Sequence, residues 1–344
     1  MVFWFWVLIT VLAVPPIAFG LVFAALYMYI RLKYMGYLVR IFQEKPLFLI
    51  PRGEKPTDAE EVSVTADDGL ILRGCYLRTP AAMRKGVILF GLEFGSNRWS
   101  CRPYCEKLIE AGYDVFALEP RNQGDSEKDP NYEPLQWVTD RDVADTRAGI
   151  KYLLTRPDAD PQGIGLFGMS KGGGTGFLAS SSIKAVRCIV TDGAYGTHTT
   201  MVPYLKRWIQ IYSDRKIIQR VLPTWFYGIV GMVGAKKVAR NRGVTYPSVE
   251  KAVSRVNRPV LMIHGGGDTY IKPEMAQALF ARLRGPKELW IVPKAKHNQA
   301  LIVAEAEYHA RLIAFFDVHL AGLVAPPAPA VESSSPAPPA PKAE

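Results

Sequence analysis

The feature that most restricts how this chain can fold is the pentapeptide Gly-Met-Ser-Lys-Gly at residues 168–172, in which Ser170 stands near two glycines. A short apolar run at 163–167 precedes it, and a run of small residues at 172–179 follows it. This order predicts a strand, a tight turn that strains the serine backbone, and a helix. Glycines are needed at both ends because a side chain there would collide where strand and helix nearly touch. The pattern therefore presents the Ser170 hydroxyl at the edge of a sheet as a nucleophile.

Two loops further along the chain carry the groups that would activate this serine. An apolar run at 259–264 predicts a strand, and the glycine-rich loop after it holds Asp268. A second predicted strand at 288–292 runs into a loop that holds His297. Serine is a weak nucleophile unless a base takes its proton, and the base needs a carboxylate to orient it. We therefore predict that His297 is the base and Asp268 the acid, in the chain order serine, acid, histidine that accompanies such a turn.

Further segments share a pattern with a known family. Ala-Gly-Tyr-Asp-Val at 111–115 precedes a predicted strand, and Pro-Arg-Asn-Gln-Gly-Asp-Ser at 120–126 follows it. Together with the serine turn and the two loops, they make residues 60–320 resemble an α/β-hydrolase of the serine-hydrolase type, similar to the serine aminopeptidase-like and membrane-anchored branches of that family. The resemblance implies a helical cap over the active site and an acyl-enzyme formed on Ser170.

One motif departs from the pattern of that family. Its members usually carry His-Gly after the third strand, and the residue that follows supplies one backbone N–H to the oxyanion hole. Here Leu92-Glu93 occupies the corresponding place, so the resemblance assigns that donor to the Phe94 N–H. The Lys171 N–H, at the positive end of the helix after the serine, is the expected second donor. We also expect the Glu93 and Lys171 side chains to form an ion pair that holds the loop against the serine turn.

Other residues compete for these roles. Asp192 follows the predicted strand at 186–191 and is the rival acid, but the loop after the next strand is the commoner acid position in the resembling family. His264 ends a predicted buried strand, which favours a core histidine over the base. An ion pair between Arg121 and Asp125 is expected to brace a nearby loop. The remaining histidines, which are expected to be structural or surface groups, are His198 in the insertion described below and His309 and His319 in an apolar terminal helix.

The rest of the chain alternates predicted strands and helices, which indicates a doubly wound, mostly parallel sheet. Ligands bind at the carboxyl ends of the strands in such sheets, which is where the serine, acid and base fall. A chain of 344 residues with 49% hydrophobic residues can form one such core. We therefore predict the α/β class, with an eight-stranded α/β-hydrolase domain at 60–322. Strands are expected near 61–67, 70–78, 86–91, 114–119, 163–167, 186–191, 259–264 and 287–292.

Nothing in the sequence indicates a cofactor or a metal site. There is no phosphate-binding loop and no glycine pattern typical of dinucleotide binding. Of the four cysteines, Cys75, Cys101, Cys105 and Cys188, only Cys101 and Cys105 share a predicted helix face. Two ligands at that spacing without a nearby histidine make a poor zinc site. We expect buried thiols, although the spacing leaves a disulfide open.

The first thirty residues indicate attachment to a membrane. No charged side chain occurs between residues 2 and 30, and about 20 apolar residues suffice to cross a bilayer core. We predict a transmembrane anchor at 1–30; a cleaved signal peptide is the alternative, although no Lys or Arg precedes the apolar run. Arg31, Lys33 and Arg40 follow it, so the positive-inside rule predicts a cytoplasmic catalytic domain. Residues 31–59 are expected to be a juxtamembrane linker.

A long insertion at 193–257 is the expected cap, and it mixes aromatic with basic residues. The net charge of +10 suits an anionic partner, and because an anchor is already present we favour a membrane lipid surface over nucleic acid. An ordinary helical cap with solvated charges is the other alternative. The Pro/Ala/Ser-rich tail at 323–344 is expected to be extended. The aromatic and basic residues of the insertion are Lys206, Arg207, Trp208, Tyr212, Arg215, Lys216, Arg220, Trp225, Phe226, Tyr227, Lys236, Lys237, Arg240 and Arg242.

The sequence thus predicts a membrane-anchored serine hydrolase that cleaves an ester, thioester or amide of a small-molecule or acyl substrate. Two alternatives stay open. A serine peptidase of the same fold is one, because a single fold hosts many chemistries. A non-catalytic scaffold is the other, and the departure at Glu93 is the feature that favours it.

Overall fold

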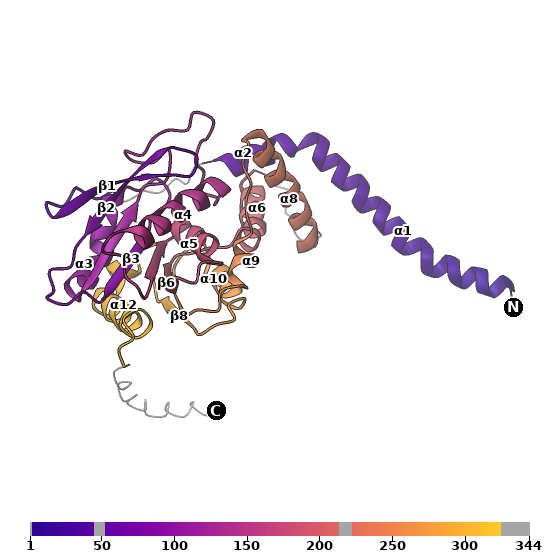
Figure 1. Ribbon diagram of the computed structural model, residues 1–344. Coiled ribbons are helices and arrows are strands. Elements are labelled where there is room, and N and C mark those ends of the chain that lie inside the picture. Colours follow the sequence, from indigo (N-terminus) through magenta and orange to yellow (C-terminus); the bar gives the residue numbers. More distant parts are fainter. Residues whose placement is uncertain (1, 45–51, 213–221, 325–344) are drawn as a thin grey trace, which may run out of the picture.

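The computed structural model describes residues 2–44, 52–212 and 222–324. Its centre is a sheet of eight strands: β1 (Ala59–Thr65), β2 (Ile71–Leu77), β3 (Gly86–Gly91), β4 (Tyr113–Leu118), β5 (Ile164–Met169), β6 (Val186–Asp192), β7 (Val260–Gly265) and β8 (Lys287–Val292). Their spatial order is β1-β2-β4-β3-β5-β6-β7-β8, as seen in Figure 1. The β1–β2 and β2–β4 pairs are antiparallel, and all the others are parallel. The predicted doubly wound sheet is confirmed.

Helices cover both faces of the sheet because alternate residues of each strand point to opposite sides. In β3, Val87 and Leu89 join one buried hydrophobic cluster, while Ile88 and Phe90 join another. The first cluster packs under α4 (Asp140–Thr155), α5 (Lys171–Ser180), α9 (Val249–Val253) and α10 (Pro273–Phe280). The second packs under α3 (Cys101–Glu110) and α12 (Glu305–His319). Short helical turns at Arg98–Ser100 and in α11 (Ala300–Val303) complete the domain.

Two long helices between β6 and β7 form the cap. These helices, α6 (His198–Tyr212) and α8 (Thr224–Asn241), lie beside each other at one end of the sheet (Figure 1). They pack closely, since a Cβ placed on Gly231 of α8 would come within 2.6 Å of Leu205 Cδ1 on α6. Of the predicted basic residues, Arg215, Lys216 and Arg220 lie outside the described residues, as does the predicted tail from residue 325 onward.

The N-terminal segment is part of this cap, which corrects the expected linker. Helix α1 (Val2–Lys33) has 32 residues and is apolar enough to cross a membrane. A second helix, α2 (Met35–Gln43), follows it directly. The apolar side chains Leu38 and Phe42 of α2 lie four residues apart on one helix face and are buried in the same cluster as the side chains of α6 and α8. Residues 35–43 therefore belong to the hydrophobic core of the cap.

Candidate active site

The serine turn has the tight geometry that its glycines predict. Ser170 lies between β5 and α5 with φ 49° and ψ −114°, a conformation that non-glycine residues rarely adopt. A Cβ on Gly168 would come within 2.6 Å of the Gly173 backbone, and one on Gly172 would come within 2.3 Å of the Gly91 carbonyl oxygen. The Ser170 N–H donates to the Asp192 carbonyl at 2.7 Å, which fixes the turn to β6. The strained serine is therefore held by close backbone packing on both sides.

The structure brings Ser170, His297 and Asp268 together, although each comes from a different strand end. Ser170 Oγ lies 2.8 Å from His297 Nε2, and His297 Nδ1 lies 2.7 Å from Asp268 Oδ2. A carboxylate only accepts hydrogen bonds, so Nδ1 carries the ring proton toward Asp268. Nε2 is then the ring nitrogen that can accept the serine proton. This is the arrangement in which a serine can act as a nucleophile at neutral pH.

Asp268 is itself held in one orientation. Its other oxygen, Oδ1, accepts from the backbone N–H groups of Tyr270 at 2.8 Å and Ile271 at 2.9 Å. His264, which was expected to be a core residue, is buried at the end of β7 and its Nε2 lies 2.7 Å from the Ile271 carbonyl oxygen. Burial lowers the pKa of His264, because the charged imidazolium loses its hydration. A neutral His264 therefore supports the loop that carries Asp268.

The rival acid Asp192 occupies a different environment. It is fully buried, and its Oδ2 accepts from the Tyr308 hydroxyl at 3.0 Å. Its Oδ1 has no hydrogen-bond partner among the described residues. Burial raises the pKa of Asp192 to about 7, and the Tyr308 hydrogen bond opposes this only in part. The carboxylate that is hydrogen-bonded to the His297 ring is that of Asp268, and Asp192 bonds to Tyr308 instead.

The two predicted oxyanion donors lie at the site with their N–H groups available. Within the described ranges, neither the Phe94 N–H nor the Lys171 N–H has a hydrogen-bond acceptor in the protein. Phe94 lines the same pocket as Ser170 and His297. Lys171 is the first residue of α5, where backbone N–H groups lack helical partners and the helix dipole is positive. Both groups suit an oxygen that gains negative charge.

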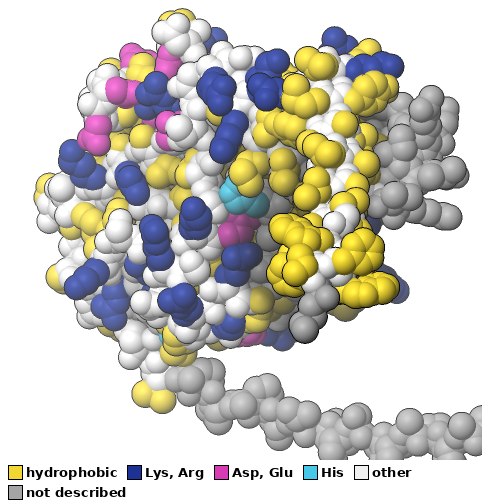
Figure 2. All heavy atoms as spheres, turned by 90° about the vertical axis from the view of Figure 1, so that its right-hand side faces the viewer, with side chains coloured by type: hydrophobic (Ala, Val, Ile, Leu, Met, Phe, Trp, Pro, Cys, Tyr) yellow, Lys and Arg dark blue, Asp and Glu magenta, His cyan; other side chains and the backbone are white. Residues whose placement is uncertain are grey.

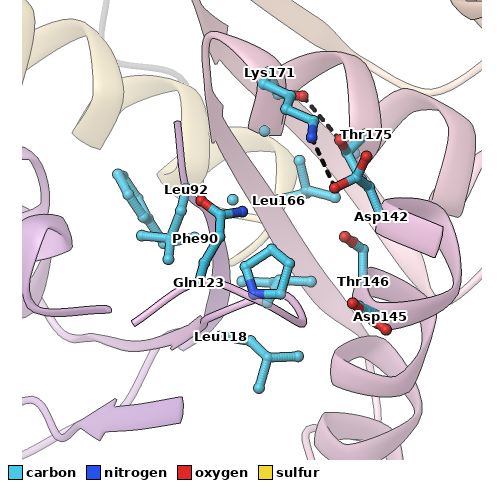
Figure 3. A pocket seen from close by; sticks show the side chains of 15 residues that line it. Phe90, Leu92, Leu118, Gln123, Asp142, Asp145, Thr146, Leu166, Lys171 and Thr175 are labelled. Carbon is cyan, nitrogen blue, oxygen red and sulfur yellow. Dashed lines mark hydrogen bonds and ion pairs between the residues drawn. The ribbon is translucent and has the colours of Figure 1, made fainter. Parts of the chain in front are cut away.

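The expected ion pair between Glu93 and Lys171 is wrong. Lys171 Nζ donates to Asp142 Oδ1 at 2.8 Å and to the Leu135 carbonyl at 2.8 Å. Figure 3 shows this side chain reaching from α5 to Asp142 on α4, along the edge of a cavity behind the serine turn. Glu93 instead accepts from Asn298 Nδ2 at 2.7 Å. Each charge is buried and takes the partner that packing places nearest, which the sequence does not reveal.

The expected pair between Arg121 and Asp125 is also wrong. The Arg121 guanidinium is buried. It donates to Asp145 Oδ1 from Nη2 at 2.7 Å and from Nε at 3.0 Å, and its Nη1 donates to Asp68 Oδ2 at 2.6 Å. Asp125 pairs with Arg98 at 2.8 Å. Both pairs still brace the loop at residues 120–126: Arg121 of the loop binds carboxylates from distant segments, and Asp125 of the loop binds the distant Arg98. The predicted bracing of this loop is confirmed, but the predicted pairing of Arg121 with Asp125 is wrong.

A pocket lined mainly by aromatic side chains lies over Ser170. Its lining includes the aromatic side chains of Phe94, Trp137, Tyr195, Tyr204 and Tyr270. Tyr270 Oη and Gln136 Oε1 lie 3.0 Å apart, and Gln136 Nε2 donates to Tyr204 Oη at 3.0 Å. These residues were missed because their positions along the chain show no motif. The aromatic content of the insertion was a signal for Tyr195 and Tyr204, whereas Trp137 and Tyr270 lie outside the insertion. Their apolar faces suit a hydrophobic portion of a substrate.

The same aromatic residues tie the pocket to the N-terminal segment. Trp137 Nε1 donates to the Phe42 carbonyl at 3.2 Å, and Tyr204 Oη donates to the Ile41 carbonyl at 3.1 Å. Both carbonyls belong to the last turn of α2, and that of Ile41 also accepts from the Glu44 N–H at 3.3 Å. The end of α2 therefore supports two walls of the pocket.

The other predicted histidines and cysteines lie away from the serine. His198 begins α6, and its backbone N–H donates to Glu250. His309 and His319 are on α12, and burial lowers the pKa of each. All four cysteines are buried free thiols. Within the part of the chain that is described, no cluster of three or more His, Cys, Asp or Glu side chains is placed to hold a metal ion.

Comparisons with known proteins agree with this architecture. The sequence matches the family described as BAAT / Acyl-CoA thioester hydrolase C terminal over residues 147–298, and the dienelactone hydrolase family over residues 73–212. It is 25% identical to the uncharacterized protein YfhR of Escherichia coli over 260 residues, which are 72% of this chain and 76% of the relative. It is 30% identical to the thiohydrolase aneE of Aspergillus aculeatus over 132 residues, which are 38% of this chain and 40% of the relative.

Solved structures show the same fold. An esterase of Pyrococcus furiosus superimposes with a TM-score of 0.59 at 21% sequence identity, and the superposition covers 80% of this chain and 100% of the esterase. At that identity the likeness concerns the fold alone. The sheet order, the strained serine turn and the two family matches all indicate the same group of proteins. The chain is a member of the α/β-hydrolase superfamily.

Proposed function

We propose that this protein is a serine hydrolase that cleaves an ester or thioester through an acyl-enzyme on Ser170. The observation that carries the proposal is the continuous hydrogen-bonded series from Ser170 Oγ through His297 to Asp268. The strained backbone at Ser170 supports it, because strain of this kind is retained where a side chain must be presented to a substrate.

The steps follow from the positions of these groups. His297 Nε2 takes the proton of Ser170 Oγ while that oxygen attacks the acyl carbonyl carbon. The carbonyl oxygen becomes negatively charged and accepts from the N–H groups of Phe94 and Lys171. His297 then donates its proton to the leaving alcohol or thiol as the C–O or C–S bond breaks. A water molecule, deprotonated by His297, then attacks the acyl carbon, the C–O bond to Ser170 breaks, and His297 returns the proton to Ser170 Oγ as the acid leaves.

The type of bond is proposed from the relatives. The matched acyl-CoA thioester hydrolase region spans residues 147–298 and so includes Ser170, Asp268 and His297. Thiohydrolase aneE carries a name for the same thioester bond, and the matched dienelactone hydrolase family is named for a lactone, which is a cyclic ester. Alcohol and thiol leaving groups need less protonation than amines, so esters and thioesters suit this site better than peptides.

We further propose that α1 anchors the protein in a membrane with the catalytic domain on the cytoplasmic side. The helix is long and apolar enough to span a bilayer. It ends in Arg31 and Lys33, which suits the positive-inside rule. The packing of α2 into the cap gives the helix a fixed connection to the catalytic domain.

Labelling with a fluorophosphonate probe tests the nucleophile. The natural protein in detergent or vesicles is expected to label in full, and the variant Ser170→Ala is expected to show none. Ser181→Ala is the matched control, because this serine caps the other end of α5 and should leave labelling unchanged. Failure of the natural protein to label, or labelling of Ser170→Ala, would contradict the proposal.

A further inference from the structure

An apolar stripe runs along the exposed side of the cap helix α8. Trp225, Ile229 and Met232 are 51%, 45% and 42% exposed, respectively. Their spacing of four and three residues places them on one face of the helix. Exposed apolar surfaces of this kind mark contact with a protein or a membrane.

The stripe begins beside the apolar part of α1. The Phe23 ring lies 5.1 Å from the Trp225 ring and 5.5 Å from the Phe226 ring, measured between centroids. Phe23 is seven residues before Ile30, the last residue of the uncharged run, which corresponds to about 10 Å of helix. The start of α8 therefore lies alongside α1 well inside its apolar length.

The other end of α8 packs against α2, the helix that follows the polar end of α1. A Cβ on Gly234 would lie 3.2 Å from Phe42 and 3.7 Å from Leu38, both in α2. Lys236, Lys237 and Arg240 follow in the next turns. Basic residues near the end of α8 thus follow the part of α8 that packs on α2, the helix directly after the basic residues that end α1. Figure 2 shows hydrophobic side chains in a band along α1, with Lys and Arg side chains spread over the neighbouring face of the domain.

We infer that the first half of α8 is immersed in the lipid leaflet beside α1, and that the cap admits an acyl chain from that leaflet to Ser170. This inference rests on the proposed anchoring by α1. The depth that we infer for α8 agrees with that of interfacial helices, which insert their apolar face about 5–10 Å into the boundary between headgroups and acyl chains. The occupant of the stripe is therefore lipid.

Helix α6 provides the route from the leaflet to the serine. Thr200 and Tyr204 line the pocket over Ser170, and Trp208 extends the same face by one turn, with its ring 6.0 Å from the Tyr204 ring. Lys206 Nζ donates to Thr224 Oγ1 at 3.3 Å, so this part of α6 lies at the start of α8. This face of α6 therefore runs from the pocket over Ser170 to the membrane depth at which Trp225 lies.

The charges on this part of α6 are compatible with immersion. Lys206 Nζ lies 5.1 Å from the Tyr227 ring centroid, and its long stem can carry the ammonium group toward the headgroups. Arg207 donates from Nη1 to the Thr269 carbonyl at 2.8 Å, which directs it toward the catalytic domain. Anionic headgroups would favour Lys206.

Spin labelling of the full chain in vesicles of phosphatidylcholine and phosphatidylglycerol tests the immersion. Nitroxides are placed at Ile229→Cys, at Ala13→Cys in α1 and at Met83→Cys, an exposed position in the β2–β3 loop (74% exposed). The four native cysteines are buried, so the unsubstituted protein measures background labelling. Accessibility to oxygen, which concentrates in lipid, is compared with accessibility to a water-soluble nickel chelate.

The expected result is that the labels at 13 and 229 are accessible to oxygen and shielded from the nickel chelate. The label at 83 should be accessible to the nickel chelate and less accessible to oxygen. If the label at 13 is in lipid while that at 229 is as open to nickel as the label at 83, the immersion is wrong and the anchor stands. If the label at 229 is shielded from both reagents, protein covers the stripe, and the inference is also wrong. A label at 13 in water overturns the anchor and the immersion together.

A second experiment tests delivery of the substrate. The double variant Trp225→Glu/Ile229→Glu is expected to hydrolyse a long-chain ester in vesicles at least about tenfold more slowly than the natural protein, because carboxylates resist entry into the leaflet. Its turnover of a soluble short-chain ester should change by less than about twofold. Met83→Glu is the matched control and should change neither. If the double variant slows both esters equally, or slows neither of them, delivery from the leaflet is wrong.

Discussion

Asn298 Nδ2 donates a hydrogen bond to Glu93 Oε2 across 2.7 Å, which joins the loop after β3 to the loop after β8. Glu93 immediately precedes the proposed oxyanion donor Phe94, and Asn298 immediately follows the proposed base His297. Both side chains are buried. Burial raises the pKa of Glu93, while the Asn298 hydrogen bond and the nearby imidazole lower it. One contact between residues 205 positions apart thus sets the distance between the base and an oxyanion donor.

Removing this contact should slow catalysis without abolishing it. Glu93→Ala is expected to lower kcat for a short ester by roughly ten- to a hundredfold, because small displacements of reacting groups carry such costs. Glu93→Gln should restore most of the turnover, because its amide oxygen still accepts from Asn298. Asn298→Ala should resemble Glu93→Ala, and the double variant should be no slower than either single one. Additive losses, or a Gln variant as slow as the Ala variant, would show that the contact does not position the site.

Substitutions in the proposed triad should have large and unequal effects. Ser170→Ala and His297→Ala are each expected to lower kcat by about 10⁶, and Asp268→Asn by about 10⁴, because the Asn side chain favours the wrong imidazole tautomer. Asp192→Asn is the control and should keep turnover within roughly threefold, since its carboxyl bonds to Tyr308 instead. Steady-state hydrolysis at neutral pH measures all four. The choice of acid is reversed if Asp192→Asn loses activity and Asp268→Asn keeps it.

The buried pair of Lys171 and Asp142 should matter for stability. Lys171→Met is expected to lower the free energy of unfolding by about 3–5 kcal/mol, because it leaves the buried carboxylate of Asp142 without its cation. Lys151→Met is a matched control on α4: its pair with Asp67 is exposed (side chains 72% and 83%) and should contribute less than about 1 kcal/mol. Urea unfolding in detergent measures both. Equal effects of the two substitutions would mean that the buried pair is not stabilising.

Asp192 should make stability decrease as the pH rises toward neutrality. Its pKa is raised from 3.8 to about 7 in the folded protein, mainly by burial. Between these values the folded state binds the proton that the unfolded state has lost, so the contribution is complete below pH 4 and is lost as the pH rises through 7. Asp192→Asn should therefore gain stability relative to the natural protein as the pH rises from 4 to 7, on the order of 1.4 kcal/mol for each pH unit, and should gain no more above pH 7. A stability difference that does not vary with pH would contradict the raised pKa.

The sequence was informative where function depends on a short stretch of chain. The strand-turn-helix around Ser170 was recognisable because steric exclusion at Gly168 and Gly172 acts between neighbours in the chain. Asp268 and His297 were recognisable because parallel strands place their carboxyl ends at one edge, and each residue follows such a strand. The parallel sheet itself followed from the alternation of strand and helix patterns. For these features local pattern and topology were sufficient.

The tertiary structure alone decided which distant groups met. Lys171 pairs with Asp142, Arg121 with Asp145 and Glu93 with Asn298, because a buried charge or amide takes the partner that packing leaves within hydrogen-bond distance. Helix α2 and the end of α1 became part of the cap for a similar reason. Their apolar side chains are buried against α6, α8 and Trp137, and an amphipathic stretch of sequence does not indicate which surface will cover it.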